Sequence, residues 1–339
     1  MIFCKLIERI VRFAHLSRTA GTALVALVGL AGLLGGTHVH AFDLQGHRGA
    51  RGLAPENTIA AFERALEVGV TTLELDIGIS ADNVPVILHD FALNPAVARD
   101  ASGNWVQSRP LVRSLTFAEL QRYDVGRLDP ASRYGQQFDT QQPRDGERIP
   151  MLAALFERVR VLGAGSVRFN IETKIDPHQP DATLEPGPFV ETLLQTIRKE
   201  RMFDRVTLQS FDWRTLQLAR RLAPGIRTAC LTTQGSSSDN LRDGAWTAGL
   251  RLADHESVAA LVKAAGCAVW SPNFNNLDEA GVEAARTLGL AVIPWTVNRV
   301  EDMRRLIGWR VDGLITDYPD RLREVMRESA MELPPPLQR

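Results

Sequence analysis

Two hydrophobic patterns alternate along this chain. Short apolar runs rich in β-branched residues predict strands, at Asp43–Gly46, Thr72–Ile79, Val167–Thr173, Val206–Gln209, Arg227–Leu231, Ala268–Trp270, Ala291–Thr296 and Gly313–Thr316. Longer stretches with apolar residues at helical spacing predict helices between most of them, including Thr58–Val68, Glu191–Arg201, Trp213–Leu222, Asp278–Leu288 and Val300–Ile307. Repeated strand–helix units favour a parallel sheet of the α/β class, and eight of them favour a closed TIM (β/α)8 barrel. A doubly wound open sheet is the alternative fold.

One stretch between His89 and Ile149 interrupts this rhythm. It is rich in Arg, Asp, Gln, Ser and Pro, and it holds a single helical piece near Phe117–Tyr123. A structureless loop of this length is uncommon in a compact domain. We therefore expect residues 90–149 to form a cap-like insertion after the second strand region, over the catalytic mouth of the barrel.

The first 41 residues have a different character. A basic segment that includes Lys5 and Arg12 precedes a small and apolar run from Ala20 to Gly36, and Val39-His40-Ala41 suits signal-peptide cleavage. The pattern predicts a signal peptide over residues 1–41 and export to the periplasm. A permanent membrane anchor is the alternative, but the apolar run is shorter than the ~20 residues that a span needs. We expect no stable span after cleavage, a barrel domain over residues 42–327 and a flexible C-terminal tail over residues 328–339.

Composition and charge narrow the class of protein. The 339 residues are 45% hydrophobic and 23% charged, which is ordinary for a globular protein. The 39 basic and 40 acidic residues leave a net charge of −1, without the basic excess typical of nucleic-acid binding. Beyond the leader, Cys230 and Cys267 fall in predicted strand regions. A disulfide and a pair of buried free thiols are both compatible with this placement.

Three acidic residues suit a metal site. Glu74 and Asp76 are two apart on one strand, so their side chains project to the same face. Glu172 stands at the end of another strand, and three carboxylates from strand ends suit one hard divalent cation, Ca²⁺ or Mg²⁺. The alternative is that Glu74 or Glu172 forms a buried ion pair with Arg48 or Lys174.

Two histidines and two cations complete the candidate chemistry. His47 and His89 each end an apolar run, where the catalytic groups of a barrel lie, and the pair suits proton transfer to and from a substrate. Arg48 and Lys174 supply positive charge that fits phosphate oxygens. Glu56 either contacts a substrate hydroxyl, orients a catalytic group, or serves only as an acid near a helix N-terminus.

Taken together, these motifs resemble those of the glycerophosphodiester phosphodiesterases. The resemblance rests, in this order along the chain, on His47-Arg48-Gly49, Pro55-Glu56-Asn57-Thr58, Glu74-Leu75-Asp76, His89-Asp90, Glu172-Thr173-Lys174, Gln209-Ser210-Phe211 and Pro294-Trp295-Thr296. It implies a TIM barrel with metal ligands Glu74, Asp76 and Glu172. It further implies acid/base histidines His47 and His89, phosphate contacts from Arg48 and Lys174, and a glycerol side lined by Glu56, Gln209 and Trp295, with Phe211 nearby.

The resemblance also sets the expected reaction. We expect metal-dependent hydrolysis of a small-molecule glycerophosphodiester to an alcohol and sn-glycerol 3-phosphate, by attack of water or of the neighbouring glycerol hydroxyl. One alternative is a phosphodiesterase of the lysophospholipase D or sphingomyelinase D type. Another is a non-catalytic periplasmic protein that binds glycerophosphodiesters. The sequence leaves the head group, the choice of cation and the oligomeric state open.

Overall fold

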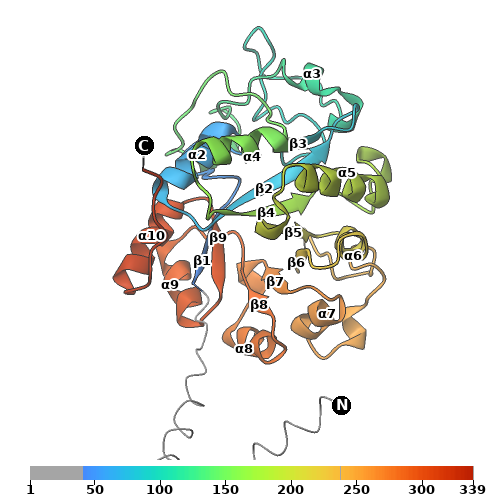
Figure 1. The fold of residues 1–339 in the computed structure, drawn as a ribbon, viewed down its shortest axis with the longest axis vertical. Coiled ribbons are helices and arrows are strands. Elements are labelled where there is room, and N and C mark those ends of the chain that lie inside the picture. The colour runs from blue at the N-terminus through green and yellow to red at the C-terminus, as the bar shows by residue number, and fades with distance from the viewer. Residues whose placement is uncertain (1–40, 237, 339) are drawn as a thin grey trace, which may run out of the picture. The chain divides into compact units, whose positions relative to one another are not determined.

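A computed structural model gives the structure of residues 41–236 and 238–338 (Figure 1). The predicted signal peptide, apart from Ala41, lies outside the described residues and stays a prediction. Eight parallel strands form the sheet: β1 (Asp43–Gly46), β2 (Thr72–Ile79), β4 (Arg168–Thr173), β5 (Val206–Ser210), β6 (Arg227–Thr232), β7 (Val269–Pro272), β8 (Ala291–Val292) and β9 (Gly313–Thr316). They are hydrogen-bonded in the order β8-β7-β6-β5-β4-β2-β1-β9.

Backbone hydrogen bonds between the β8 and β9 regions bring the two ends of this order together. The Asp312 N–H donates to the Val292 carbonyl at 2.9 Å, and the Ile315 N–H donates to the Pro294 carbonyl at 3.0 Å. The sheet is therefore a nearly closed barrel, which confirms the TIM barrel over the open sheet. Strand β8 is shorter than the predicted Ala291–Thr296 because Pro294 has no N–H for a strand ladder.

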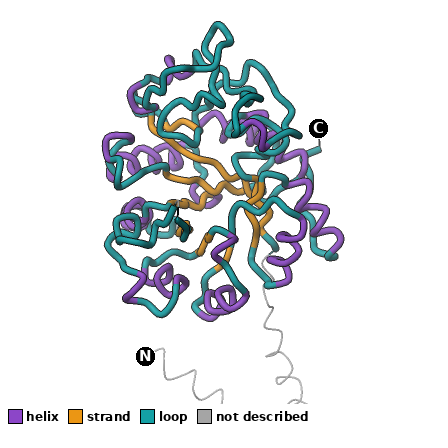
Figure 2. The backbone as a smooth tube through the Cα atoms, turned by 180° about the vertical axis from the view of Figure 1, so that it is seen from behind, coloured by secondary structure: helices purple, strands orange, loops and turns teal. Residues whose placement is uncertain are grey.

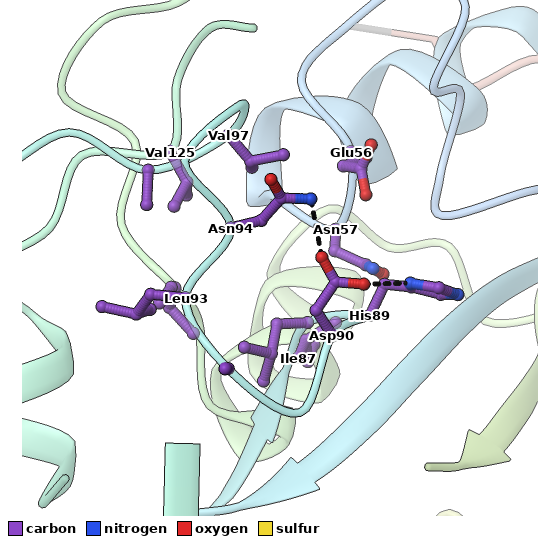
Figure 3. Close-up of a pocket in the computed structure, with 13 residues that line it drawn as sticks. Glu56, Asn57, Ile87, His89, Asp90, Leu93, Asn94, Val97 and Val125 are labelled. Atoms are coloured by element: carbon purple, nitrogen blue, oxygen red, sulfur yellow. Dashed lines mark hydrogen bonds and ion pairs between the residues drawn. The ribbon is translucent and has the colours of Figure 1, made fainter. Parts of the chain in front are cut away.

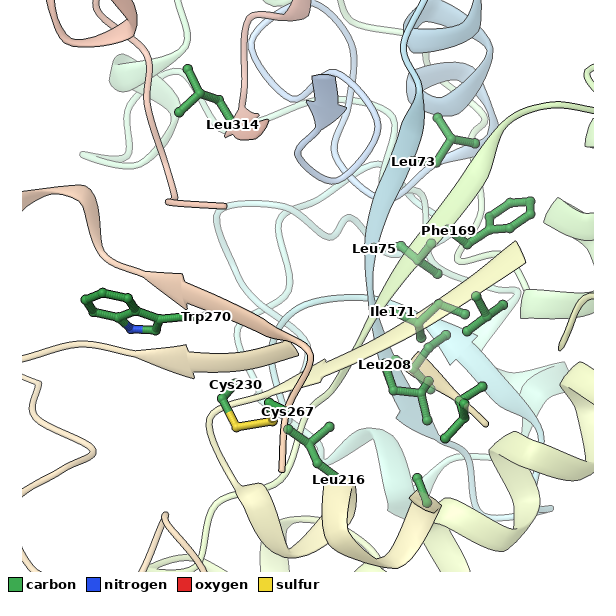
Figure 4. Packing of buried hydrophobic residues seen from close by; sticks show 14 of the residues in the cluster. Leu73, Leu75, Phe169, Ile171, Leu208, Leu216, Cys230, Cys267, Trp270 and Leu314 are labelled. Atoms are coloured by element: carbon green, nitrogen blue, oxygen red, sulfur yellow. A yellow bond between two sulfur atoms is a disulfide. The ribbon is translucent and has the colours of Figure 1, made fainter. Parts of the chain in front are cut away.

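Helices surround the barrel, as the view from behind in Figure 2 shows. They are α2 (Ile59–Val68), α4 (Leu152–Val161), α5 (Pro186–Lys199), α6 (Trp213–Leu222), α7 (Val258–Ala264), α8 (Glu279–Thr287), α9 (Val300–Gly308) and α10 (Pro319–Glu328). The strands present alternate residues to these helices. Leu73, Leu75 and Ile171 belong to the large apolar cluster that also contains the buried faces of the helices (Figure 4).

The opposite face of the same strands fills the barrel with polar groups. The Asn170 side-chain amide on β4 donates to the Gln45 and Gln209 carbonyl oxygens, both at 2.8 Å. The Gln209 amide in turn donates to the Glu74 carboxylate at 2.7 Å. This chain of hydrogen bonds ties β1, β2, β4 and β5 together beneath the carboxyl ends of the strands.

The irregular stretch follows β3 (Pro85–Ile87), which pairs antiparallel with β2. It contains the short helix α3 (Phe117–Leu120) within the predicted helical piece, and an apolar cluster of its own that includes Leu93, Val112 and Leu120. Its far end returns to the loop after β1, where the Gln141 amide donates to the Arg51 carbonyl at 2.7 Å. The insertion is thus a small packed unit beside the first barrel loop.

The C-terminal tail, which the sequence predicts to be flexible, makes contacts with the barrel. Met331, Leu333 and Leu337 pack against the main apolar cluster, and the Leu337 N–H donates to the Leu66 carbonyl on α2 at 2.8 Å. These apolar side chains, on either side of the proline run, gain a partly buried surface there. The flexibility of residues 328–339 stays a prediction. None of the described helices is long and apolar enough to cross a membrane.

The two cysteines beyond the leader form a disulfide. Cys230 lies on β6 and Cys267 immediately precedes β7, with their Cα atoms 5.9 Å apart (Figure 4). Both residues are buried. The structure therefore answers the question that the sequence left open.

This disulfide predicts a thermal stability that depends on oxidation. A bond between residues 37 apart stabilises the fold by about 3–4 kcal/mol, mainly by restricting the unfolded chain. Thiol reductant should lower the melting temperature by roughly 5 °C, while a C230A/C267A variant should be insensitive to reductant. Equal melting temperatures of the oxidised and reduced wild-type protein, or alkylation of both thiols without prior reduction, would contradict the bond.

Candidate active site and metal centre

Three carboxylates meet at the carboxyl ends of two neighbouring strands. Glu74 and Asp76 point inward from β2, and Glu172 points inward from β4, where it pairs in register with Asp76. One oxygen from each of the three lies within 4.8 Å of the others, and all three residues are buried. The structure thus brings together the three residues that the sequence proposed as metal ligands.

Burial makes these like charges costly to keep. Burial, with the neighbouring charge of Asp76, raises the pKa of Glu74 well above its ordinary range. Burial likewise raises the pKa of Glu172 to about 7, although Lys174 opposes the shift. The pKa of Asp76 is instead lowered, because Arg48, His89 and Lys174 outweigh the effect of its burial. The triad is therefore under-neutralised by its protein neighbours.

The donor set fits a hard divalent cation. Asp76 Oδ1 is buried and has no hydrogen-bond partner among the described residues, as expected of an oxygen kept for a metal. The ion pairs considered as the alternative also form, since Lys174 Nζ lies 2.7 Å from Glu172 and Arg48 Nε lies 3.3 Å from Asp76. They do not balance the charge, because Arg48 is shared with a fourth carboxylate, Glu56.

Both candidate histidines are held by carboxylates. His47 Nδ1 lies 2.7 Å from Asp317 Oδ1, and His89 Nδ1 lies 2.7 Å from Asp90 Oδ1. Each contact fixes the ring and leaves Nε2 as the free nitrogen. His47 Nε2 lies 3.9 Å from Glu74, next to the triad.

The environment keeps both imidazoles neutral near pH 7. Burial, helped by the charge of Arg51, lowers the pKa of His47 to about 4. Burial and the charge of Arg48 also lower the pKa of His89. A neutral imidazole accepts a proton, which is the property that a general base needs.

Arg48 is held in a buried cluster of polar side chains. Its Nη1 donates to Glu56 Oε1 at 2.7 Å, and its backbone N–H donates to Glu74 Oε2 at 2.8 Å. Tyr134 from the insertion donates its hydroxyl to Glu56 and accepts from Arg51 at 2.9 Å. Burial would raise the pKa of Glu56, but the charges of Arg48 and Arg51 outweigh it and lower that pKa. Glu56 therefore orients the guanidinium of Arg48.

A tight turn brings Arg48 into this position. Arg48 and Gly49 both have positive φ, at 50° and 85°. A Cβ on Gly49 would lie 2.6 Å from the backbone of Ala61 on α2, so the close approach of loop and helix requires glycine. Thr58 caps α2 by accepting from the Ala61 N–H, which ends the loop that carries Glu56.

One cavity of about 210 Å³ joins these groups. Phe211 and Trp295 form one wall, with ring centroids 5.3 Å apart in an edge-to-face arrangement. Of the predicted site residues, the cavity is lined by His47, Arg48, Glu74, His89, Glu172, Gln209, Phe211 and Trp295. Asp76, Lys174 and Glu56 lie immediately behind this lining, each bonded to one of its members.

A second, mostly apolar pocket lies on the other side of His89 (Figure 3). In this view Asp90 bridges His89 and Asn94, whose amide donates to Asp90 Oδ2 at 2.7 Å. Leu93 and Val125 of the insertion are among its lining residues, and its volume is only about 40 Å³.

Three residues that shape the site, Asp317, Arg51 and Tyr134, were not predicted from the sequence. Asp317 holds His47 and also pairs with Arg51 at 2.8 Å, while Tyr134 joins Glu56 to both arginines. Asp317 directly follows β9, so its place at a strand end was a usable signal. Tyr134 lies in the irregular insertion, where no periodicity marked it.

The sequence of this chain is similar to those of known proteins. The sequence model of the glycerophosphoryl diester phosphodiesterase family matches residues 47–321. A glycerophosphodiester phosphodiesterase from Caldanaerobacter subterraneus subsp. tengcongensis is 31% identical over 282 residues, which cover 83% of this chain and 96% of that protein.

Solved structures show the same likeness. A protein from Silicibacter pomeroyi, provisionally named a glycerophosphoryl diester phosphodiesterase, superposes with a TM-score of 0.78 at 35% identity, over 87% of this chain and 96% of the other. A phosphodiesterase from Oleispira antarctica, solved with the product sn-glycerol-3-phosphate, has a TM-score of 0.62 at 22% identity, over 84% and 96% of the two chains. At 22% identity, the likeness to the Oleispira antarctica structure shows a shared fold only.

The triad makes a prediction that does not depend on turnover. Asp76→Asn or Glu172→Gln removes one charged oxygen ligand and should lower the affinity for Ca²⁺ or Mg²⁺ by about a hundredfold in calorimetric titration. Glu279→Gln on the exposed start of α8 is the matched control and should leave the affinity unchanged. Equal affinities in all of these variants would place any cation elsewhere.

Proposed function

Because the chain belongs to the glycerophosphoryl diester phosphodiesterase family, we propose that it hydrolyses glycerophosphodiesters to an alcohol and sn-glycerol 3-phosphate with one divalent cation, Ca²⁺ or Mg²⁺. The observation that carries the proposal is the convergence of the buried triad, two carboxylate-held histidines and Arg48 on one cavity. The product complex of the Oleispira antarctica protein supports the choice of product.

Arg48 and Lys174 bind the phosphate in this proposal. Arg48 belongs to the lining of the cavity, and the bond of its guanidinium to Glu56 fixes its direction. Lys174 adds a compact positive charge beside Glu172. Both cations stabilise negative charge on the phosphate oxygens as the transition state forms.

Glu74, Asp76 and Glu172 hold the cation, which when bound supplies a Lewis acid for a phosphate oxygen. Gln209 keeps Glu74 in place through its 2.7 Å hydrogen bond. Leu231 and Ile315 lie in the same lining as Phe211 and Trp295 and add apolar surface to it.

The two histidines move the protons. One Nε2 accepts a proton from the nucleophile, which is water or the neighbouring glycerol hydroxyl. The other histidine acts from its protonated form, an imidazolium stabilised by its carboxylate, and donates its Nε2 proton to the alcohol oxygen as the bond from phosphorus to that oxygen breaks. The proton gained by the first histidine then passes to the second through water, which restores both starting forms. Asp317 and Asp90 are positioning residues, because each holds the Nδ1–H of its histidine and so presents Nε2 to the substrate.

The apolar pocket beside the site offers little room for the long acyl chain of a lysophospholipid. The apolar pocket beside His89 measures about 40 Å³, roughly the space of one or two methylene groups. Val161 and Leu222 are the large hydrophobic side chains that are exposed among the described residues. They end α4 and α6, at the face of the barrel opposite the site. The hypothesis of lysophospholipase D activity therefore has less support than the hypothesis that the protein hydrolyses a water-soluble diester.

We also propose that the protein works in the periplasm. The leader pattern of residues 1–41 supports export, and the disulfide between Cys230 and Cys267 is of the kind that persists in an oxidising compartment. Fractionation of cells that express the full chain tests this proposal.

Activity on glycerophosphocholine is the direct test of the reaction. The protein lacking residues 1–41 should release choline and sn-glycerol 3-phosphate, and EDTA should abolish turnover until Ca²⁺ or Mg²⁺ is restored. His47→Ala and His89→Ala should each lower kcat by about 10²- to 10⁴-fold and keep cation binding. Binding of the diester without chelator-sensitive turnover would favour the binding-protein alternative instead.

Asp317→Asn tests the positioning of His47. An amide at this position no longer stabilises the Nδ1–H form, so kcat should fall by about 10²- to 10⁴-fold. KM should change little, because Asp317 is not part of the cavity lining. Asp320→Asn, an exposed acid three residues further on, is the control. A variant with unchanged kcat would remove Asp317 from the mechanism.

A further inference from the structure

A third cavity of about 370 Å³ adjoins the catalytic one. It is formed by the segments that follow β4, β5 and β6, three neighbouring strands whose carboxyl ends also carry the catalytic groups (Figure 1). Phe211, directly after β5, belongs to the lining of both cavities. The two cavities are therefore neighbours across the ring of Phe211, and we call the third cavity the Trp246 cavity.

Aromatic rings and carboxylates dominate the chemistry of the Trp246 cavity. Trp246 and His178 lie edge to face, with ring centroids 6.0 Å apart. Asp239 and Asp243 bring two negative charges to the same lining, and Asp243 Oδ2 lies 3.5 Å from His178 Nε2. An aromatic face beside carboxylates is the environment that binds an ammonium group.

Hydrogen bonds fix the walls of the cavity. The Trp246 carbonyl accepts from the Trp213 N–H on α6 at 2.7 Å, and Asp243 Oδ1 accepts from the Ala245 N–H at 2.9 Å. The buried Asn240 side chain donates to the Phe211 carbonyl at 3.3 Å and so joins the segments after β5 and β6. The backbone at Trp246 and Phe211 and the carboxylate of Asp243 are thus held in place.

We propose that the Trp246 cavity receives the alcohol part of the diester and favours alcohols that carry a cationic amine or quaternary ammonium. The proposal rests on the proposed function and names its substrate class. The pocket across His89 has about 40 Å³, against about 370 Å³ in the Trp246 cavity. The Trp246 cavity therefore has the larger room for a head group of more than a few atoms.

Arg242 brings one positive charge to the lining of the Trp246 cavity, opposite in sign to the carboxylates of Asp239 and Asp243. Its side chain is exposed, and no ion pair to it is formed within the described residues. Asp239 and Asp243 outnumber it, which leaves the cavity acidic. A polyol head group, held by the carboxylates and by stacking on Trp246, is the competing occupant.

A substrate panel separates these occupants. Steady-state kinetics with glycerophosphocholine, glycerophosphoethanolamine, glycerophosphoglycerol and glycerophosphoinositol should give the two cationic diesters a KM about tenfold lower than the two polyol diesters. Trp246→Ala should raise the KM for glycerophosphocholine about tenfold, with kcat retained and the polyol diesters little affected. Trp246→Phe should restore most of the loss, because it keeps an aromatic face.

Two variants that remove charges of opposite sign should change KM in opposite directions. Asp243→Asn should raise the KM for glycerophosphocholine about threefold to tenfold, whereas Arg242→Gln should lower it by a similar factor. Both changes should shrink at high salt and be small for glycerophosphoglycerol. Two opposite effects from one lining cannot arise from general damage to the fold, so these variants decide the matter even if Trp246→Ala unfolds.

The outcomes distinguish this inference from the proposed reaction. Turnover of all four diesters with equal KM, or charge variants without effect, overturns the cationic subsite and leaves the diesterase standing. Lower KM for the polyol diesters, lost on Trp246→Ala, overturns it in favour of a polyol subsite. Absence of turnover with every diester overturns the proposed reaction itself.

Discussion

Buried negative charge is the constraint on which this structure depends. Glu74, Asp76 and Glu172 hold three carboxylate oxygens within 4.8 Å of one another, away from bulk water. Such an arrangement is costly unless positive charge or protonation compensates for it. Lys174 and Arg48 supply part of the positive charge, and a divalent cation supplies the remainder in the proposed reaction. The two histidines and Arg48 line the same cavity as Glu74 and Glu172.

The barrel creates the centre through strand alternation. Leu73 and Leu75 pack outward against the helices, so Glu74 and Asp76 are forced into the barrel. Parallel pairing of β2 with β4 then places Asp76 opposite Glu172 in register. The same two strands thus provide the apolar surface that stabilises the fold and the charged surface of the candidate site.

Much of this could be predicted from sequence because it is local. Strand positions and the triad follow from spacings of two residues, and the histidines follow from strand ends. Tyr134 could not be predicted, because its contacts with Glu56 depend on the fold of an aperiodic insertion. The contact of Leu337 with α2 could not be predicted either, since it depends on a surface far away in sequence. The pairing of Cys230 with Cys267 likewise needed the distance between two strands.

The central claim is that the triad holds one cation. Crystals grown with Mn²⁺, a hard cation that accepts the same oxygen ligands, allow its position to be measured by anomalous scattering. We expect a single strong peak bounded by carboxylate oxygens of Glu74, Asp76 and Glu172. A map without a peak there, in which Lys174 and Arg48 alone neutralise the triad, would show that the triad holds no cation.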